Sequence, residues 1–342
     1  ERVRMVDVSI YDASPGGGRL VLIAELVRLK LMRAERHSIG AASADTAMAA
    51  ARSARDFLYA VGWEEHALEP THQVWPADSK ALILADSDQA MSTGISRRLP
   101  QRGFGSTAFL AVAATTLEQR AGMVTIRADE PNDFVQLVSS ARQFFRGSFD
   151  AVFQLWPLDF VGRNPTNAVE SLARSGAIFG TVNLIQAIAT VFRGQSSWPR
   201  LCIVTRGAQD CSYGEASALC QSKAVEPAQA AVLGLAHVVE AEMPELDCVC
   251  IDLDPDTELH AASKEGSLRD EADAIITETA RAVKPQTSKW REQNVIFRHG
   301  VTKRFAARIE RFSAAAPRGG AGPARLAVPL SAAYRLNVGG TT

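Results

Sequence analysis

Two cysteines and two aspartates alternate through one short apolar run, and their types and spacing could support chemistry. Cys248, Cys250, Asp252 and Asp254 lie in the run CVCIDLD. Alternate residues of a strand point to the same face, so the two thiols could bind a metal or react together. The aspartates stand at the carboxyl end of the predicted strand, where ligands of parallel α/β sheets bind.

Each of these candidates also has a structural interpretation, which we favour. No His or third Cys accompanies the thiols at ligand spacing, so they are interpreted as small core residues, and the aspartates as turn caps. His237 could be a general base, but it falls on the polar side of its helix. Arg206-Gly207 could bind an anion, but a glycine there also suits a tight turn. Trp156 and Trp198 flank strands as packing anchors. We therefore predict no catalytic, cofactor-binding or metal-binding residue.

The elements that position these residues form a strand–helix–strand unit. The β-branched runs at 201–205 and 248–253 flank a helical pattern that Pro227 opens and Pro244 closes. The apolar residues between the prolines form a single stripe at helical spacing: Ala228, Ala231, Val232, Leu235 and Val239. A strand, a crossover helix and a second strand predict a parallel sheet flanked by helices.

The same alternation extends over most of the chain. Strands are predicted at 81–85, 107–113, 122–126 and 151–155, and a closing hairpin at 294–298 and 303–311. The predicted helices cover 92–102, 129–145, a long stretch starting at Asn164-Pro165, and 274–283, the last after a charged, solvated stretch at 256–273.

The glycines of a dinucleotide-binding turn are missing. Such a turn needs residues without side chains so that pyrophosphate can approach the helix N-terminus. Asp86-Ser87-Asp88 follows the first strand instead, and its two carboxylates would repel phosphate. Gly103 and Gly105 form a GxG, but Ala108 occupies the third glycine position. Gly339-Gly340 lies too close to Thr342 to be judged.

The Tyr and Lys pair of short-chain reductases, four residues apart, is also missing. No Lys follows at that spacing after any of the tyrosines, which are Tyr11, Tyr59, Tyr213 and Tyr334. The chain has no GxSxG elbow, P-loop or HExxH motif either. The predicted sheet therefore carries no recognisable catalytic motif.

Composition excludes several classes of partner. Lys and Arg number 37 against 38 Asp and Glu, so a net charge of -1 predicts no nucleic-acid or acidic-membrane binding. No apolar run approaches the roughly 18 residues of a membrane span. Five cysteines, an odd number without CxxC, argue against a disulfide framework and for a reducing, cytoplasmic location.

The ends of the chain suggest a piece of a longer polypeptide. Residues 3–11 and 20–31 predict a β-hairpin, which is marginal alone and is expected to complete a sheet from an upstream domain. Residues 35–56 and the Pro/Gly-rich 313–333 are predicted linkers, and 334–342 is predicted to begin another domain.

The sequence resembles the structural subdomain of ketoreductases in modular type I polyketide synthases. The resemblance rests on LCIVTRGAQ, EPAQAAVLGLAHVVEAEMPEL and CVCIDLD, and covers residues 57–312. Supporting segments follow in the same order as in the family: LYAVGWE, EPNDF, AVFQLWPLD and NVIFRHGVTKRFAARIERF. Residues 1–34 are similar to the last hairpin of a hot-dog-fold dehydratase domain, the usual upstream neighbour.

The resemblance implies an α/β fold with a truncated Rossmann-like parallel sheet and flanking helices, plus an N-terminal β-hairpin of a neighbouring domain. It implies no cofactor in this chain. NADPH and catalytic residues are expected in a separate catalytic half, with dehydratase, enoylreductase and acyl carrier protein as further partners in a homodimeric synthase. The YRLNV strand after the second linker fits an enoylreductase, whereas Gly339-Gly340 fits the catalytic half.

Other functions stay open at this point. The parent reductase could be a pseudo-ketoreductase without activity. The chain could instead be an autonomous nucleotide- or small-molecule-binding enzyme that uses Asp252, Asp254 and His237, or a plain interaction module.

Overall fold

The computed structural model describes residues 3–11, 20–30, 59–66, 75–105, 108–160, 176–209, 211, 216, 227–255, 264–280 and 294–311. The chain divides into two compact units, Glu1–Leu58 with Arg311–Thr342, and Tyr59–Glu310. The predicted linkers, the segment 334–342 and the Asn164-Pro165 helix start lie outside the described residues.

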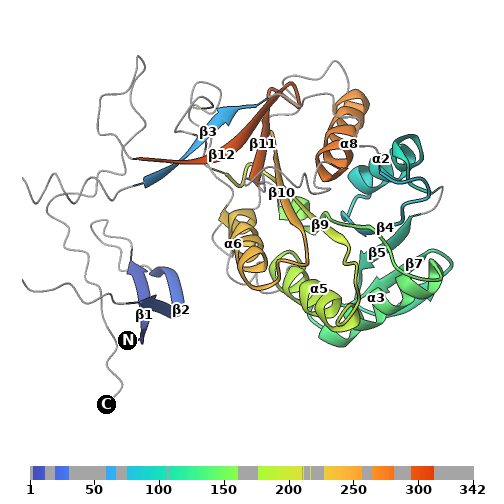
Figure 1. The fold of residues 1–342 in the computed structure, drawn as a ribbon, viewed down its shortest axis with the longest axis horizontal. Coiled ribbons are helices and arrows are strands. Elements are labelled where there is room, and N and C mark those ends of the chain that lie inside the picture. The colour runs from blue at the N-terminus through green and yellow to red at the C-terminus, as the bar shows by residue number, and fades with distance from the viewer. Residues whose placement is uncertain are drawn as a thin grey trace, which may run out of the picture. The chain divides into compact units, whose positions relative to one another are not determined.

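The first unit contains the predicted hairpin. Strands β1 (Val3–Tyr11) and β2 (Leu20–Lys30) pair antiparallel, with register shifts between Val6 and Val8 and between Ile10 and Tyr11 (Figure 1). Such irregularities are typical of β-bulges, which increase the local twist of a ribbon.

A ten-stranded sheet forms the centre of the second unit (Figure 1). Seven of its strands are parallel. They lie in the spatial order β7 (Met123–Ile126), β5 (Phe109–Ala113), β4 (Ala81–Ala85), β8 (Ala151–Gln154), β9 (Arg200–Arg206), β10 (Cys248–Leu253), β11 (Asn294–Arg298). In chain order this is 3-2-1-4-5-6, as in dinucleotide-binding folds, followed by a seventh strand. The Rossmann-like prediction is confirmed. All six strands of the dinucleotide-binding order are present, so the sheet itself is not shortened.

Antiparallel strands extend both sides of this parallel sheet. The short β6 (Glu118–Arg120) pairs with β7, and β12 (Lys303–Arg311) pairs with β11. Beside β12 lies β3 (Tyr59–Glu65), the outermost strand on that side. The closing hairpin was predicted, whereas β6 was not, because its three residues are all exposed and polar.

Helices cover both faces of the sheet, as predicted (Figure 1). One face packs against α3 (Pro131–Phe144), α5 (Ile178–Val191) and α6 (Pro227–Glu242). The other packs against α2 (Ala90–Arg98) and α8 (Lys264–Ala280). Strands β4 and β10 are buried along their whole length, which explains why β4 is entirely apolar and β10 is apolar except for Asp252.

Helix α8 corrects one prediction. It begins at Lys264, so the charged stretch predicted as solvated contains the first turns of a helix. Glu271 and Asp273 in that stretch pair with Arg206 and Arg98, which lie far away in the sequence. These charges therefore join α8 to strand β9 and to helix α2 rather than mark a loop.

Acid should weaken the loop that precedes α3. The buried Asp133 carboxylate accepts bonds from Arg127 N, Nε and Nη2 at 2.8–3.0 Å, and this guanidinium lowers the pKa of Asp133. A carboxyl whose folded pKa lies below its unfolded value stabilises above the unfolded pKa and loses that contribution as pH falls through the folded pKa. We expect Asp133→Asn to be less stable than wild type at pH 7, with the difference shrinking below about pH 4. Urea unfolding at pH 3 to 7 measures this, and a constant difference would contradict it.

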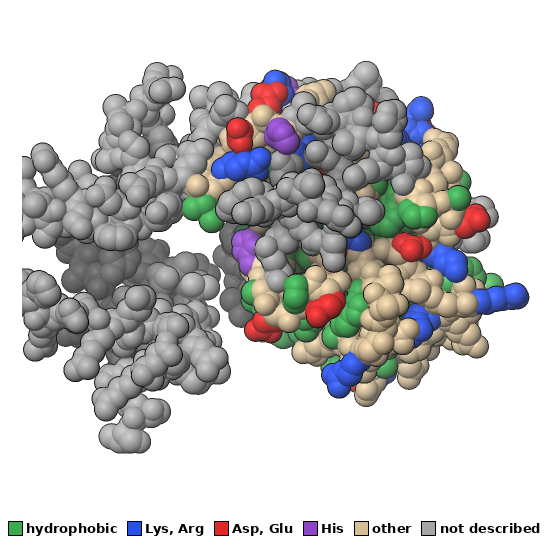
Figure 2. Space-filling view, viewed as in Figure 1, with side chains coloured by type: hydrophobic (Ala, Val, Ile, Leu, Met, Phe, Trp, Pro, Cys, Tyr) green, Lys and Arg blue, Asp and Glu red, His purple; other side chains and the backbone are tan. Residues whose placement is uncertain are grey.

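No helix among the described residues is both long and apolar enough to cross a membrane. Positive and negative side chains are interspersed over the face of the second unit seen in Figure 2, without a basic stripe.

Candidate functional site

The carboxyl edge of the parallel strands is where a doubly wound sheet binds its ligands. The chain winds from β4 to β5 and β7 on one side, then returns to β8 and continues on the other. The switch point therefore lies between the ends of β4 and β8, where a dinucleotide would place its pyrophosphate against the following helix.

At the end of β4, the chain's own carboxylates occupy the amides of helix α2. Asp86 accepts hydrogen bonds from Met91 N at 2.9 Å and from Ser92 N at 2.8 Å. Asp88 Oδ1 accepts Ala90 N at 3.0 Å, and the next amide, Thr93 N, bonds back to the Gln89 carbonyl. These are the amides that a phosphate would use.

A third carboxylate holds the same loop from β8. Asp159 Oδ1 accepts Ser87 N at 2.8 Å, and Asp159 belongs to η2 (Trp156–Phe160), the 3-10 turn that follows β8. Three carboxylates therefore converge on the β4–α2 turn, and a phosphate would have to displace Asp86 and overcome the charge of the other two. The sequence suggested only the repulsion, not the intramolecular cap.

Burial raises the pKa of Asp86, and a hydrogen bond with Asp88 raises it further. A carboxyl whose folded pKa exceeds its unfolded value contributes stability below the unfolded pKa and loses it as pH rises through the folded pKa. We therefore expect wild type to lose part of its stability as pH rises above about 4, and Asp86→Asn to lack this component. Urea unfolding of both proteins between pH 3.5 and 7 measures the slopes. Parallel slopes would contradict the assignment.

The end of β8 is filled by an indole ring. Trp156 is 1% exposed and stacks edge-to-face on Phe134 of α3. On α5 and just before it, Gly180 and Gly176 leave room for the ring, because a Cβ on either would lie 2.5–2.6 Å from its Cε3 or Cζ3. Trp156 therefore packs in the core, as predicted from the sequence. Trp198 likewise packs on Phe192.

At the ends of β9 and β10, Asp252 connects four segments. Its carboxylate accepts Thr205 Oγ1 at 2.7 Å, the amides of Ala208 and Gln209 at 2.8 and 3.2 Å, and Arg298 Nη2 at 2.9 Å. Asp252 is 1% exposed and the Arg298 side chain 3%, so this is a buried ion pair. The arrangement caps the turn after β9, as the structural interpretation predicted.

The other polar candidates are also engaged within the fold. Asp254 Oδ2 accepts Gly300 N at 3.0 Å, and His237 Nε2 lies 2.9 Å from Asn294 Nδ2 on an exposed face. The Arg206 guanidinium makes two bonds, of 2.8 and 2.9 Å, to the Glu271 carboxylate. Gly207 has a φ of +68°, as the tight-turn interpretation requires. Arg206 Nη1 also donates to the Asp254 carbonyl at 2.8 Å, so these two residues are in contact, whereas His237 contacts Asn294.

The strand cysteines are buried thiols. Burial raises the pKa of Cys202 to about 12, and a hydrogen bond with Cys248, followed by burial, raises the pKa of Cys250. Such thiols are poor nucleophiles at neutral pH. Cys211 is disulfide-bonded, which the odd number of cysteines did not predict, whereas Cys202, Cys248 and Cys250 are free thiols. Within the described ranges, no three His, Cys, Asp or Glu residues are grouped to hold a metal.

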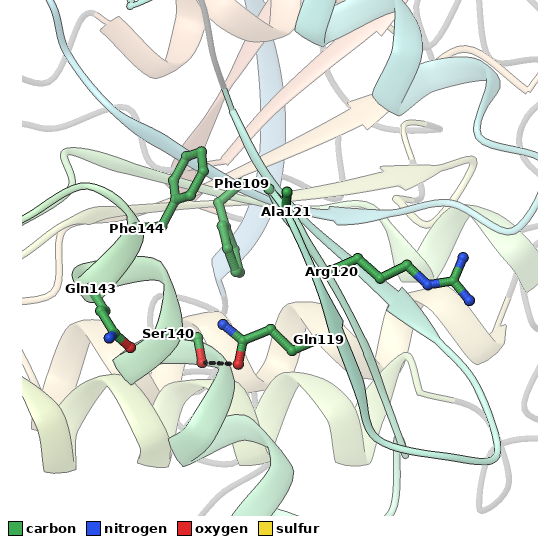
Figure 3. A pocket seen from close by; sticks show the side chains of 8 residues that line it. Phe109, Gln119, Arg120, Ala121, Ser140, Gln143 and Phe144 are labelled. Carbon is green, nitrogen blue, oxygen red and sulfur yellow. Dashed lines mark hydrogen bonds between the residues drawn. The ribbon is translucent and has the colours of Figure 1, made fainter.

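A shallow hollow of about 390 Å³ lies at the opposite, amino edge of the sheet (Figure 3). Phe109 and Phe144 line it on one side, and Gln119 bonds to Ser140 across it. Because Phe109 is the first residue of β5, the hollow lies far from the switch point and contains no paired acid or base.

Comparisons with known proteins show the fold. No family model matches the sequence, and no curated protein matches it. A solved structure of the adenylation, ketoreductase and pseudo Asub domains of a keto acid-selecting NRPS module is similar, with a TM-score of 0.55 and 16% identity, over 74% of this chain and 18% of that one. An N-terminal ketoreductase from the macrolactin assembly line gives a TM-score of 0.51 and 14% identity, over 75% and 45%.

The fold is therefore Rossmann-like, similar to that of these two ketoreductase-containing structures. The chain spans less than half the length of either structure.

Proposed function

We propose that this chain is the structural, non-catalytic subdomain of a ketoreductase or pseudo-ketoreductase region in a type I polyketide synthase module. The observation that carries the proposal is the closed switch point. Asp86 and Asp88 occupy the amides of α2, and Trp156 fills the end of β8. A doubly wound sheet closed in this way retains its packing surface without its nucleotide site.

Sequence and fold support the same proposal independently. The ordered family segments span residues 57–312, and the two similar structures contain ketoreductases. In this proposal, NADPH and the catalytic residues belong to a separate half. Dehydratase, enoylreductase and acyl carrier protein domains of a homodimeric, cytoplasmic synthase complete the set of partners.

A bracing role needs a surface for the catalytic half. Val61 on β3 and Ile309 on β12 are 54% and 79% exposed, at the side of the sheet where β3 is outermost. An exposed strand edge beside apolar side chains is unfavourable in water and favours a covering partner. We assign the catalytic half to this side.

Calorimetric titration with NADPH tests the proposal. The chain alone should show no binding, and the chain joined to its catalytic half should bind NADPH. Micromolar affinity of the chain alone would overturn the non-catalytic assignment. Ile309→Asp should weaken copurification with the catalytic half, while the control Arg269→Asp, at an exposed position of α8, should not.

The second candidate function is an autonomous small-molecule-binding enzyme that uses Asp252, Asp254 and His237. Alanine at exposed His237 distinguishes the two, because it should abolish any such activity without unfolding the protein. The bonds of both aspartates to turn amides favour the structural role.

A further inference from the structure

Three buried polar atoms at the carboxyl edge have no hydrogen-bonding partner among the described residues. They are Gln154 Oε1, Trp156 Nε1 and Gln229 Nε2, and the three residues are at most 1% exposed. A buried polar atom without a partner costs about 1–3 kcal/mol, and native proteins contain few of them. Three of them at one edge therefore indicate a group that satisfies them.

Two of the atoms lie on the same face of the sheet. Gln154 ends β8, and its Nε2 donates to Thr181 Oγ1 of α5 at 2.9 Å, which leaves Oε1 as the unpaired acceptor. Trp156 follows two residues later and meets α5 with the Cε3–Cζ3 edge of its ring. The Nε1–H group is on the opposite edge of an indole, so it is directed away from the glycines of α5.

The third atom comes from the first turn of α6. Gln229 Oε1 accepts Arg206 N at 2.6 Å at the end of β9, which leaves its Nε2 as a donor. Strand β9 lies beside β8, with Ile203 opposite Gln154, and η2, which begins with Trp156, contacts both β9 and α6. All three side chains therefore belong to one layer, between the carboxyl ends of β8 and β9 and the helices α5 and α6.

The chemistry of the three atoms defines the ligand. They offer an indole N–H donor, an amide N–H₂ donor and an amide carbonyl acceptor, all neutral. A hydroxyl oxygen accepts two hydrogen bonds and donates one, which matches this set. Arg206 and Asp252, the charged residues at the carboxyl ends of β9 and β10, already pair with Glu271 and Arg298, so neither would serve as the counter-ion of a charged ligand.

We propose that this layer binds a neutral hydroxyl oxygen, supplied by a buried water or a small alcohol, through Trp156, Gln154 and Gln229. Buried waters typically make about three such bonds to otherwise unsatisfied groups. The site is independent of the scaffold role, since a structural half and an enzyme could both contain it. It lies on the β8–β9 side of the switch point, which the Asp86 cap does not occupy.

NMR of the full chain with ¹⁵N-labelled tryptophan tests this in the wild-type protein. We expect a cross-relaxation peak between the Trp156 indole proton and a long-lived water if water is the ligand. If an alcohol binds instead, this peak is absent and the Trp156 resonance shifts on titration with millimolar isopropanol. The absence of both the water peak and the shift would overturn the proposal.

A Trp156→Phe variant provides the control, because it removes the indole N–H and keeps an aromatic ring. The water peak, or the isopropanol-dependent shift, should be lost in this variant and kept in Trp75→Phe, whose ring packs against Phe104 on the other face of the sheet. A peak or shift that persists in Trp156→Phe, or that is lost in Trp75→Phe, would contradict the site.

Discussion

Asp252→Asn is expected to lower the free energy of unfolding by about 3–5 kcal/mol, the usual cost of breaking a buried ion pair. The Arg298 guanidinium stays charged, and its side chain is 3% exposed, so it would be left without a counter-charge. The asparagine NH2 group would also replace one of the two carboxylate oxygens, so it would face either Ala208 N, which now donates to Oδ1, or Gln209 N, which now donates to Oδ2. Urea unfolding at pH 7 measures the change.

The same substitution on the surface provides the control. Asp270→Asn, on an exposed position of α8, should change stability by no more than about 0.5 kcal/mol. Arg298→Met in the Asp252→Asn background should cost less than the sum of the two single changes, because the uncompensated charge is gone. A folded Asp252→Asn protein that loses under about 1 kcal/mol would show that this pair does not hold the β9–β10 edge together.

The parallel sheet was predictable because its strands are buried on both faces. The run ALILA at 81–85 is continuously apolar, and CVCIDL at 248–253 is apolar except for Asp252, as is typical of strands covered on both faces. The proline that starts α3 and the apolar stripe of α6 set their helical boundaries in the same way. Local sequence was sufficient here because burial and local propensity agree.

Helix α8 was misplaced because its polar side chains are satisfied far away in the sequence. Glu271 pairs with the partly buried Arg206 of strand β9, and Glu278 pairs with the buried Arg304 of strand β12. A charged stretch has the same local pattern whether water or a distant guanidinium solvates it. Only the tertiary structure distinguishes the two cases, so pattern analysis placed a loop where a helix begins.

The position of the candidate site, at the carboxyl ends of the strands, could be predicted from the sequence, but most of its hydrogen bonds could not. Strand-end aspartates were predicted as turn caps, and Asp252 and Asp254 bond to turn amides. The Asp86 cap was missed because a capping side chain is expected at the N-cap position, which Gln89 occupies. Asp86 lies three residues earlier, and its carboxylate reaches the amides of Met91 and Ser92. Gln154 and Gln229 are polar residues within otherwise apolar segments, and this pattern was the one sequence feature that could have indicated a buried polar site.

Trp156→Ala is expected to cost about 3–5 kcal/mol of unfolding free energy, because it removes a fully buried ring from between β8, α3 and α5. Gly180→Leu alone should cost about 1–3 kcal/mol, since even its Cβ would lie 2.6 Å from Trp156 Cζ3. Thermal and urea unfolding measure both changes.

The double variant decides whether ring and glycine form one packing unit. With Trp156→Ala present, the Gly180→Leu side chain can enter the space that the indole occupied, and a leucine also favours the helix over glycine by about 1 kcal/mol. The double variant should therefore be more stable than Trp156→Ala alone by more than that helix-propensity gain. Gly234→Leu is the matched control, because a Cβ on this α6 glycine would meet no atom within 4 Å, and it should add only the propensity gain in either background. Additive losses at Gly180 would mean that Trp156 and α5 do not share the end of β8, and the closed switch point would then need another explanation.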